Sequence, residues 1–121
     1  MAIFQTNLVT LMHQRLQYLS KRSQVLTENI AHADIPGALR HDLKPFRDLV
    51  QKRSLDASRN PVTSASLSLD FKQEDTKIHR QEIEKELEIL EMNHNALNHQ
   101  AVMDILSTLH KLYRTALARN G

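Results

Sequence analysis

The sequence has no cysteine and no tryptophan, and only two glycines, three prolines and five aromatic residues among 121. Without cysteine the chain cannot form a disulfide framework, a thiolate metal site or a cysteine nucleophile. Two glycines are too few for the Gly-rich loops that hold phosphates in nucleotide-binding folds. No apolar run approaches about 18 residues, so no membrane span is expected, and the first residues do not resemble a cleaved signal peptide.

The charge is nearly balanced, with 16 basic and 14 acidic residues. Residues 38–80 carry nine basic and six acidic residues, whereas residues 81–121 carry four basic and six acidic ones. Hydrophobic periodicity follows the same division, because the two ends are strongly periodic and the middle is not. We therefore divide the chain into an N-terminal helix (1–37), a weakly structured central segment (38–80) and a C-terminal helix (81–121), the two ends forming one helical domain.

Residues 1–37 carry an apolar stripe at helical spacing. Positions at steps of three, four or seven share one face of a helix. Those positions here are Phe4, Leu8, Met12, Leu16, Leu19, Leu26, Ile30 and Ala33. The run is uninterrupted until Pro36, which removes an amide donor and pushes Ile35 out of the α region. We expect a helix over residues 6–33.

Residues 81–121 carry a longer stripe, which predicts a helix over residues 79–118. Glutamates occupy its early turns and basic residues its last ones, a polarity that favours the helix dipole. The stripe consists of Ile83, Leu87, Leu90, Leu97, Ala101, Ile105, Leu109, Leu112 and Ala116.

The second half of this helix has more apolar surface than one antiparallel partner covers. A second face lies beside Leu109 and consists of Val102, Leu106, Tyr113 and Leu117. Burial of each such side chain is worth roughly 1.5–3 kcal/mol, so something besides the first helix should cover them. Folded-back central sequence and other subunits are the two candidates. We favour other subunits and predict these five residues as a subunit interface.

The middle has weaker signals. Residues 45–50 predict a short helix with proline at its first position, and residues 51–63 are polar and read as a loop. Residues 64–71 alternate between apolar and polar, as in one half-buried strand, which has no obvious partner strand. The expected fold class is all-α, with two long terminal helices packing as an antiparallel hairpin or coiled coil and a flexible, in part β, middle.

The residues with reactive side chains form no pattern typical of chemistry. Seven histidines are present, but no two have the i, i+4 spacing of a helical metal clamp, and His94 lies on the apolar stripe. No serine lies in a G-x-S-x-G turn. We predict no catalytic residue, no metal and no cofactor.

Basic side chains cluster in the middle of the chain. They are Arg40, His41, Lys44, Arg47, Lys52, Arg53 and Arg59. A phosphate-contacting arm is one interpretation. The interleaved acids Asp42, Asp48 and Asp56 and the lack of an aromatic stacking platform favour a solubilising loop, so we expect no nucleic-acid partner.

The junction after the first helix carries the residues that suggest a family. They are Asn29, Ile30, Ala31, Ala33, Asp34, Pro36 and Gly37. The segment resembles the N-I-A-N-A-[DN]-T-P-G-[YF] signature of bacterial flagellar axial proteins, which form the rod and hook, and differs from it at His32, Ile35 and Ala38. In physical terms, small residues allow close packing, Asp34 can satisfy freed backbone groups, and Pro36 with Gly37 turns the chain.

The likeness extends before the junction, at Arg15, Leu16, Leu19, Arg22, Ser23 and Leu26, and after it. Asp42-Leu43-Lys44-Pro45-Phe46 is similar to a D-L-x-F element of the family. The second helix resembles the family's C-terminal helix at Glu86, Glu88, Leu90, Asn95, Leu97, Gln100, Ala101, Ile105, Leu106, Leu112, Thr115 and Ala116.

The resemblance implies a structural subunit of the basal-body rod, without catalysis. Members of this family are exported through the flagellum-specific type III apparatus without a cleaved signal, and polymerise through their terminal helices into the periplasmic rod. Implied partners are other rod proteins, MS-ring and rod-adapter proteins and the export apparatus, with self-association and no membrane insertion. The residues alone leave open a cytosolic helical-hairpin binding module that acts on an acidic partner.

Overall fold

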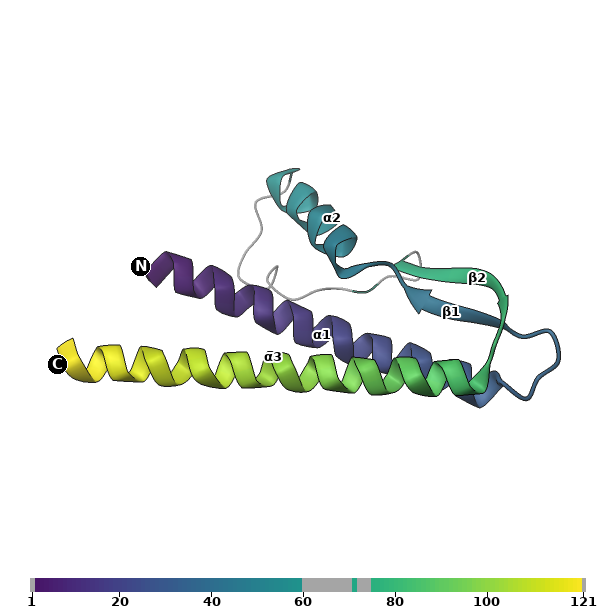
Figure 1. Ribbon diagram of the computed structural model, residues 1–121. Helices are drawn as coiled ribbons and strands as arrows, with labels where there is room; N and C mark the ends of the chain where they lie inside the picture. Colours follow the sequence, from purple (N-terminus) through teal and green to yellow (C-terminus); the bar gives the residue numbers. More distant parts are fainter. Residues whose placement is uncertain (1, 60–70, 72–74, 121) are drawn as a thin grey trace.

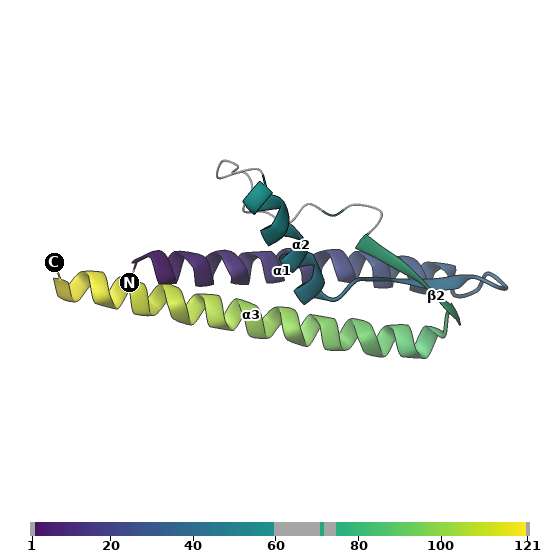
Figure 2. The ribbon, with the colours of Figure 1, turned by 90° about the horizontal axis from the view of Figure 1, so that it is seen from above.

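The computed structural model describes residues 2–59, 71 and 75–120. In chain order the elements are α1 (Ala2–His32), β1 (Leu39–Leu43), α2 (Phe46–Arg59), β2 (Thr76–Glu82) and α3 (Lys85–Asn120). α1 and α3 lie side by side, and both chain ends lie at the same end of the pair (Figure 1). The two strands lie over the opposite end of the pair, where α1 finishes and α3 begins (Figure 2).

The antiparallel pairing of α1 and α3 is fixed by contacts along its length. Asn29 near the end of α1 contacts Glu88 near the start of α3, and the Asn95 side chain contacts the Leu19 carbonyl further along. The predicted all-α class with two long, antiparallel terminal helices is therefore confirmed. α1 and α3 contain 31 and 36 residues, about 46 and 54 Å at 1.5 Å per residue.

α1 ends where the sequence predicts. The amides of Ala33 and Ile35 bond to carbonyls three residues back, at 3.2 and 3.0 Å, in place of regular helical bonds. Gly37 then adopts a φ of +76°, in the left-handed region that glycine enters without a Cβ penalty. Together with Pro36, this glycine turns the chain back toward α1 and into β1.

The two strands form an antiparallel pair that the sequence analysis did not predict. His41 lies opposite Ile78 and Leu43 opposite Thr76, with an irregularity between Leu39 and His41. The predicted helix start at residue 79 is wrong, because residues 76–82 pair with β1 and α3 begins only at Lys85. The strand expected over residues 64–71 lies outside the described residues except for Phe71, which is half-buried against the core.

α2 is longer than the short helix predicted over residues 45–50. The Pro45 carbonyl accepts hydrogen bonds from the amides of Asp48 and Leu49, so Pro45 immediately precedes the first turn. Residues 51–59, predicted as loop, are helical. A polar segment can remain helical here because Phe46 and Leu49 of the first turn attach α2 to the core.

Aromatic and cationic side chains attach α2 to α1. The rings of Tyr18 and Phe46 lie 5.4 Å apart, and the Arg15 guanidinium lies over both of them. The Tyr18 hydroxyl also donates a 3.0 Å hydrogen bond to the Lys44 carbonyl. Cation–π contacts of this kind contribute about 0.5–1 kcal/mol at partly exposed sites.

The core lies where α1 meets α3 and α2. Its buried members are Tyr18, Leu19, Val25, Leu43, Leu49, Val102 and Leu106. The expectation that Val102 and Leu106 would be left for other subunits is wrong, because both pack within the chain. Leu87, Leu97 and Leu112, from the stripe expected to face the partner helix, are exposed instead.

The C-terminal end of α3 extends past the beginning of α1 in both views (Figures 1 and 2). Tyr113 and Leu117 continue the row of Leu106 and Leu109 at steps of four, but they are 47 % and 55 % exposed. The apolar row that packs against α1 therefore continues into the last turns of α3, where its side chains are exposed.

None of the helices in the described ranges combines the length and the hydropathy that a membrane span requires.

The two apolar rows of α3 should respond differently to the same truncation. Leu106→Ala removes a side chain that is 6 % exposed and should lower the free energy of unfolding by about 2–5 kcal/mol through the cavity it leaves. Leu112→Ala, at a side chain that is 59 % exposed, should change it by less than about 0.5 kcal/mol. Urea unfolding, followed by circular dichroism on protein diluted until it is monomeric, measures both. Equal losses would mean that the row assignment is wrong.

Candidate functional site

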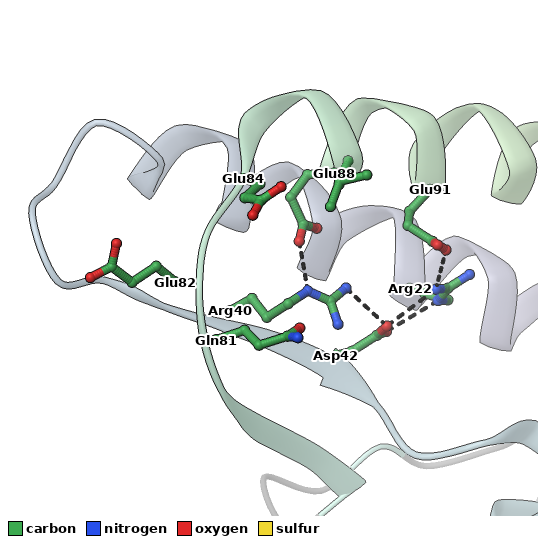
Figure 3. A pocket seen from close by; sticks show the side chains of 9 residues that line it. Arg22, Arg40, Asp42, Gln81, Glu82, Glu84, Glu88 and Glu91 are labelled. Atoms are coloured by element: carbon green, nitrogen blue, oxygen red, sulfur yellow. Dashed lines mark hydrogen bonds and ion pairs between the residues drawn. The ribbon is translucent and has the colours of Figure 1, made fainter.

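A hollow of about 390 Å³ lies where the strands meet α1 and the first turns of α3 (Figure 3). Most of the side chains that line it are charged. They are Arg22, Arg40, Asp42, Gln81, Glu82, Glu84, Leu87, Glu88 and Glu91. Polar side chains from α1, β1, β2 and the start of α3 therefore meet around the hollow. It lies at the opposite end of the helix pair from the exposed Tyr113 and Leu117.

Arg22 of α1 connects β1 and α3. Its Nε and Nη2 atoms donate to the two carboxylate oxygens of Asp42, both at 3.1 Å, and Nη2 also donates to Glu91 Oε2 at 2.8 Å. The two parallel bonds to Asp42 match the planar fork of a guanidinium to a carboxylate, the strongest geometry for such a pair. One side chain thus positions two elements that are distant in the chain.

Glu88 is the most deeply buried acid of the site, with 2 % of its surface exposed. Its Oε1 accepts a 2.6 Å bond from Arg40 Nε, and its Oε2 accepts a 3.1 Å bond from Asn29 Nδ2. Arg40 also donates to Asp42 at 3.3 Å. A buried carboxylate is tolerated only when paired and hydrogen-bonded, and Arg40 and Asn29 meet both requirements.

Asn29 attaches α1 to the backbone of β1. Its Oδ1 accepts a 3.0 Å bond from the His41 amide, and its Nδ2 donates a 2.6 Å bond to the His41 carbonyl. These backbone groups would otherwise lie on the strand edge that faces away from β2. Asn29 therefore provides hydrogen-bond partners for the backbone at the outer edge of β1, and its side-chain amide also donates to Glu88 of α3.

The charges of the site alter the pKa values of its members. Burial raises the pKa of Asp42. The hydrogen bonds and charge of Arg22, the hydrogen bond from the Leu43 amide and the charge of Arg40 together lower it by more, so the pKa lies below its ordinary value. For Arg22, burial lowers the pKa, yet Asp42 and Glu91 outweigh it and raise the pKa above the usual value. Asp42 and Arg22 therefore remain ionised at neutral pH.

A second polar contact lies further along the helix pair. The buried Asn95 side chain donates a 2.7 Å hydrogen bond from Nδ2 to the Leu19 carbonyl. Its Oδ1 is buried without a hydrogen-bond partner among the described residues. A buried polar side chain with one matching position on the facing helix specifies the register of the pair at a cost in stability.

The charged side chains of the hollow form ion pairs that connect α1, β1 and α3. The carboxylates of Asp42, Glu88 and Glu91 accept bonds from the guanidinium groups of Arg22 and Arg40, which hold the elements that carry them together. Within residues 2–59, 71 and 75–120, no three histidine, aspartate or glutamate residues are placed together to hold a metal ion. The arrangement stabilises a junction between elements.

The motif residues have different roles at the end of α1. Asn29 is buried, whereas Ile30 and Ala33 are half-buried, and Ala31, Asp34 and Pro36 are exposed. Gly37 supplies the left-handed turn. Among the seven motif residues, Asn29 hydrogen-bonds to Glu88, which lines the hollow, a contact that the sequence analysis did not assign to it.

The predicted interface residues are separated by the fold. Val102 and Leu106 lie in the core, Leu109 is half-buried, and Tyr113 and Leu117, in the last turns of α3, are exposed. Only Tyr113 and Leu117 are therefore exposed for contact with another subunit, and their role in a subunit interface stays a prediction.

The network of Arg22, Arg40, Asp42 and Glu88 was missed at the sequence level. Arg40 and Asp42 are two residues apart, as are neighbours on one face of a strand, and Glu88 and Glu91 are three apart on one side of a helix. These spacings could have indicated facing pairs. The charged residues of the middle, however, were interpreted as a solvated loop.

Comparison with known proteins finds no match to the model of any protein family and no match among curated proteins.

Acid should destabilise the protein through Asp42. Because its folded-state pKa lies below the unfolded value of about 3.9, its contribution to stability is complete above about pH 5 and is lost as the pH falls through the folded-state pKa. Asp42→Asn should lower the free energy of unfolding by about 1–3 kcal/mol at pH 7 and should flatten its decline between about pH 5 and pH 3. Urea titrations across this pH range measure both effects, and an unchanged slope would contradict the assignment.

Both removal of the Asn29 side chain and its replacement by a carboxylate should lower the free energy of unfolding. Asn29→Ala leaves both His41 backbone groups unpaired and should cost about 1–3 kcal/mol of unfolding free energy. Asn29→Asp should cost more at pH 7, because the new carboxylate would face Glu88 and the His41 carbonyl, which are both acceptors.

Adding Glu88→Gln to Asn29→Asp should recover part of that extra loss, because it removes the facing charge. Asn98→Ala, at an exposed asparagine of α3, is the matched control and should have little effect. Urea unfolding measures all four variants, and equal stability of Asn29→Asp and Asn98→Ala would refute the role given to Asn29.

Proposed function

We propose that this chain is a structural subunit of the bacterial flagellar basal body, the proximal rod protein FlgB. It would polymerise through its terminal helices and help to link the MS ring to the drive shaft. It would act by assembly and not by catalysis.

The observation that carries the proposal is the junction at residues 29–37 in its structural setting. This segment resembles the axial-protein signature, and in the structure it ends one long terminal helix and leads into β1, whose Arg40 bonds to Glu88 of the other. A signature placed at the junction of two paired terminal helices fits a protein whose terminal helices assemble.

Uncovered apolar surface on α3 also supports assembly. Tyr113 and Leu117 continue the α1-facing row through the last turns of α3 and are exposed. Exposed apolar side chains at the end of the α1-facing row are suited to contact with a helix of a neighbouring subunit. The partners proposed on this basis and from the resemblance are other rod proteins, MS-ring and rod-adapter proteins and the export apparatus, in the periplasmic part of the basal body.

A cytosolic binding module acting on an acidic partner has less support. Arg40, in the basic cluster on which that interpretation rests, pairs with Glu88 and Asp42, and Lys52 pairs with Asp75 at 3.3 Å. These intramolecular pairs reduce the positive charge that the middle of the chain offers to a partner.

Incorporation into basal bodies tests the proposal. Tyr113→Asp and Leu117→Asp should leave the helicity of the purified protein unchanged, because both side chains are exposed. Each should lower the amount of the chain in isolated basal bodies at least about tenfold, since burying a new charge costs more than the 1.4 kcal/mol equivalent to that factor. Swimming in soft agar should fall with it.

Ser107→Asp places the same charge at an exposed polar position of α3 and should incorporate normally. Immunoblots of basal bodies and whole cells measure the ratio for each variant. Absence of the wild-type chain from intact basal bodies would overturn the proposal.

A further inference from the structure

α3 carries a second apolar stripe on a side that the described part of the chain leaves open. Its large residues are all exposed and are Leu87, Leu90, Leu97, Ile105 and Leu112. Ile105 and Leu112 immediately precede Leu106 and Tyr113 of the α1-facing row, so the stripe lies about 100° around the helix from that row. The two rows are therefore separate surfaces of one helix.

The shape of the stripe fits another helix. Its members follow steps of three, seven or eight residues, with His94, Ala101 and Thr108 between them. From Leu87 to Leu112 it is about 38 Å long at 1.5 Å per residue. A long, narrow row of this kind packs against a second helix as in a coiled coil, and Leu97 is 68 % exposed at its middle.

The charge on α3 indicates the direction of that partner. Exposed Glu84 and Glu86 flank exposed Lys85 and give α3 a net acidic start, whereas Lys111, Arg114 and Arg119 are exposed at its end. A parallel copy of α3 would place like charges together, whereas an antiparallel copy places the acidic start of each helix beside the basic end of the other.

We propose that the stripe binds the same stripe of a second copy of this chain, α3 against α3 in antiparallel orientation about a two-fold axis. A register centred on Ala101 places Leu97 of one copy opposite Ile105 of the other, and Leu90 opposite Leu112. The small side chain at the axis allows the helices to approach closely. The proposal rests on α3 alone and does not depend on the rod function.

The mass of the free protein tests the contact. Sedimentation equilibrium at micromolar concentration should give twice the chain mass of 14.0 kDa. Leu97→Asp should weaken the dimer at least about tenfold, because it places a charge in the middle of the contact. Met103→Asp is the matched control, since Met103 is 46 % exposed on the opposite side of α3, and it should leave the dimer intact.

Cross-linking tests the direction. The chain has no cysteine, so Leu90→Cys and Leu112→Cys each introduce a unique thiol. With a short bis-maleimide, a mixture of the two variants, one of them carrying a size tag, should give mainly the mixed cross-linked product. Dominant Leu90→Cys self-linking would indicate parallel helices and would overturn the proposal.

The outcomes separate this inference from the proposed function. A wild-type monomer in sedimentation, or a Leu97→Asp variant that dimerises as well as the wild type, would overturn the dimer whatever the basal-body experiment gives. A dimer with the predicted cross-links would support it even if the chain were absent from basal bodies.

Discussion

The arrangement of this molecule depends on the guanidinium group of Arg22. From the middle of α1 it binds Asp42, 20 residues later in β1, and Glu91, 69 residues later in α3. Charges removed from water stabilise a fold only when their hydrogen-bonding capacity is met. Arg40 and Asn29 complete the network by pairing with Glu88 and with the backbone of β1. The strand pair is therefore attached to the helices by directional polar bonds, which fix where it lies.

The two halves of the helix pair are consequently held together by different forces. The end near the strands is held by ion pairs and by hydrogen bonds of the Asn29 side chain. The half with Val102 and Leu106 is held by apolar packing against α1 around Tyr18. Asn95 lies between the two halves and specifies the register at the cost of an unsatisfied oxygen. Polar groups thus provide alignment, and the apolar contacts provide most of the burial energy.

The sequence predicted the long helices because periodicity and Pro36 are strong local signals. It misassigned the rows of α3 for a physical reason: the row that faces α1 includes Glu88 and Asn95, whose burial depends on partners elsewhere in the chain. The other stripe, which contains no acidic or amide side chain, therefore looked like the packed one. β1 and β2 carry charged residues in place of apolar alternation, so neither they nor the hollow could be recognised without knowing which elements meet.

The pairing of Leu43 with Thr76 has a consequence for how such a chain can change length. The chain leaves the strand pair and returns to it at neighbouring points, so the segment between residues 43 and 76 is closed by the strands themselves. Doubling the number of residues in a loop closed in this way adds only about 0.6 kcal/mol of closure entropy. Residues inserted between α2 and β2 would therefore enlarge the molecule without changing the geometry of the helix pair. An additional domain could be accommodated at this position.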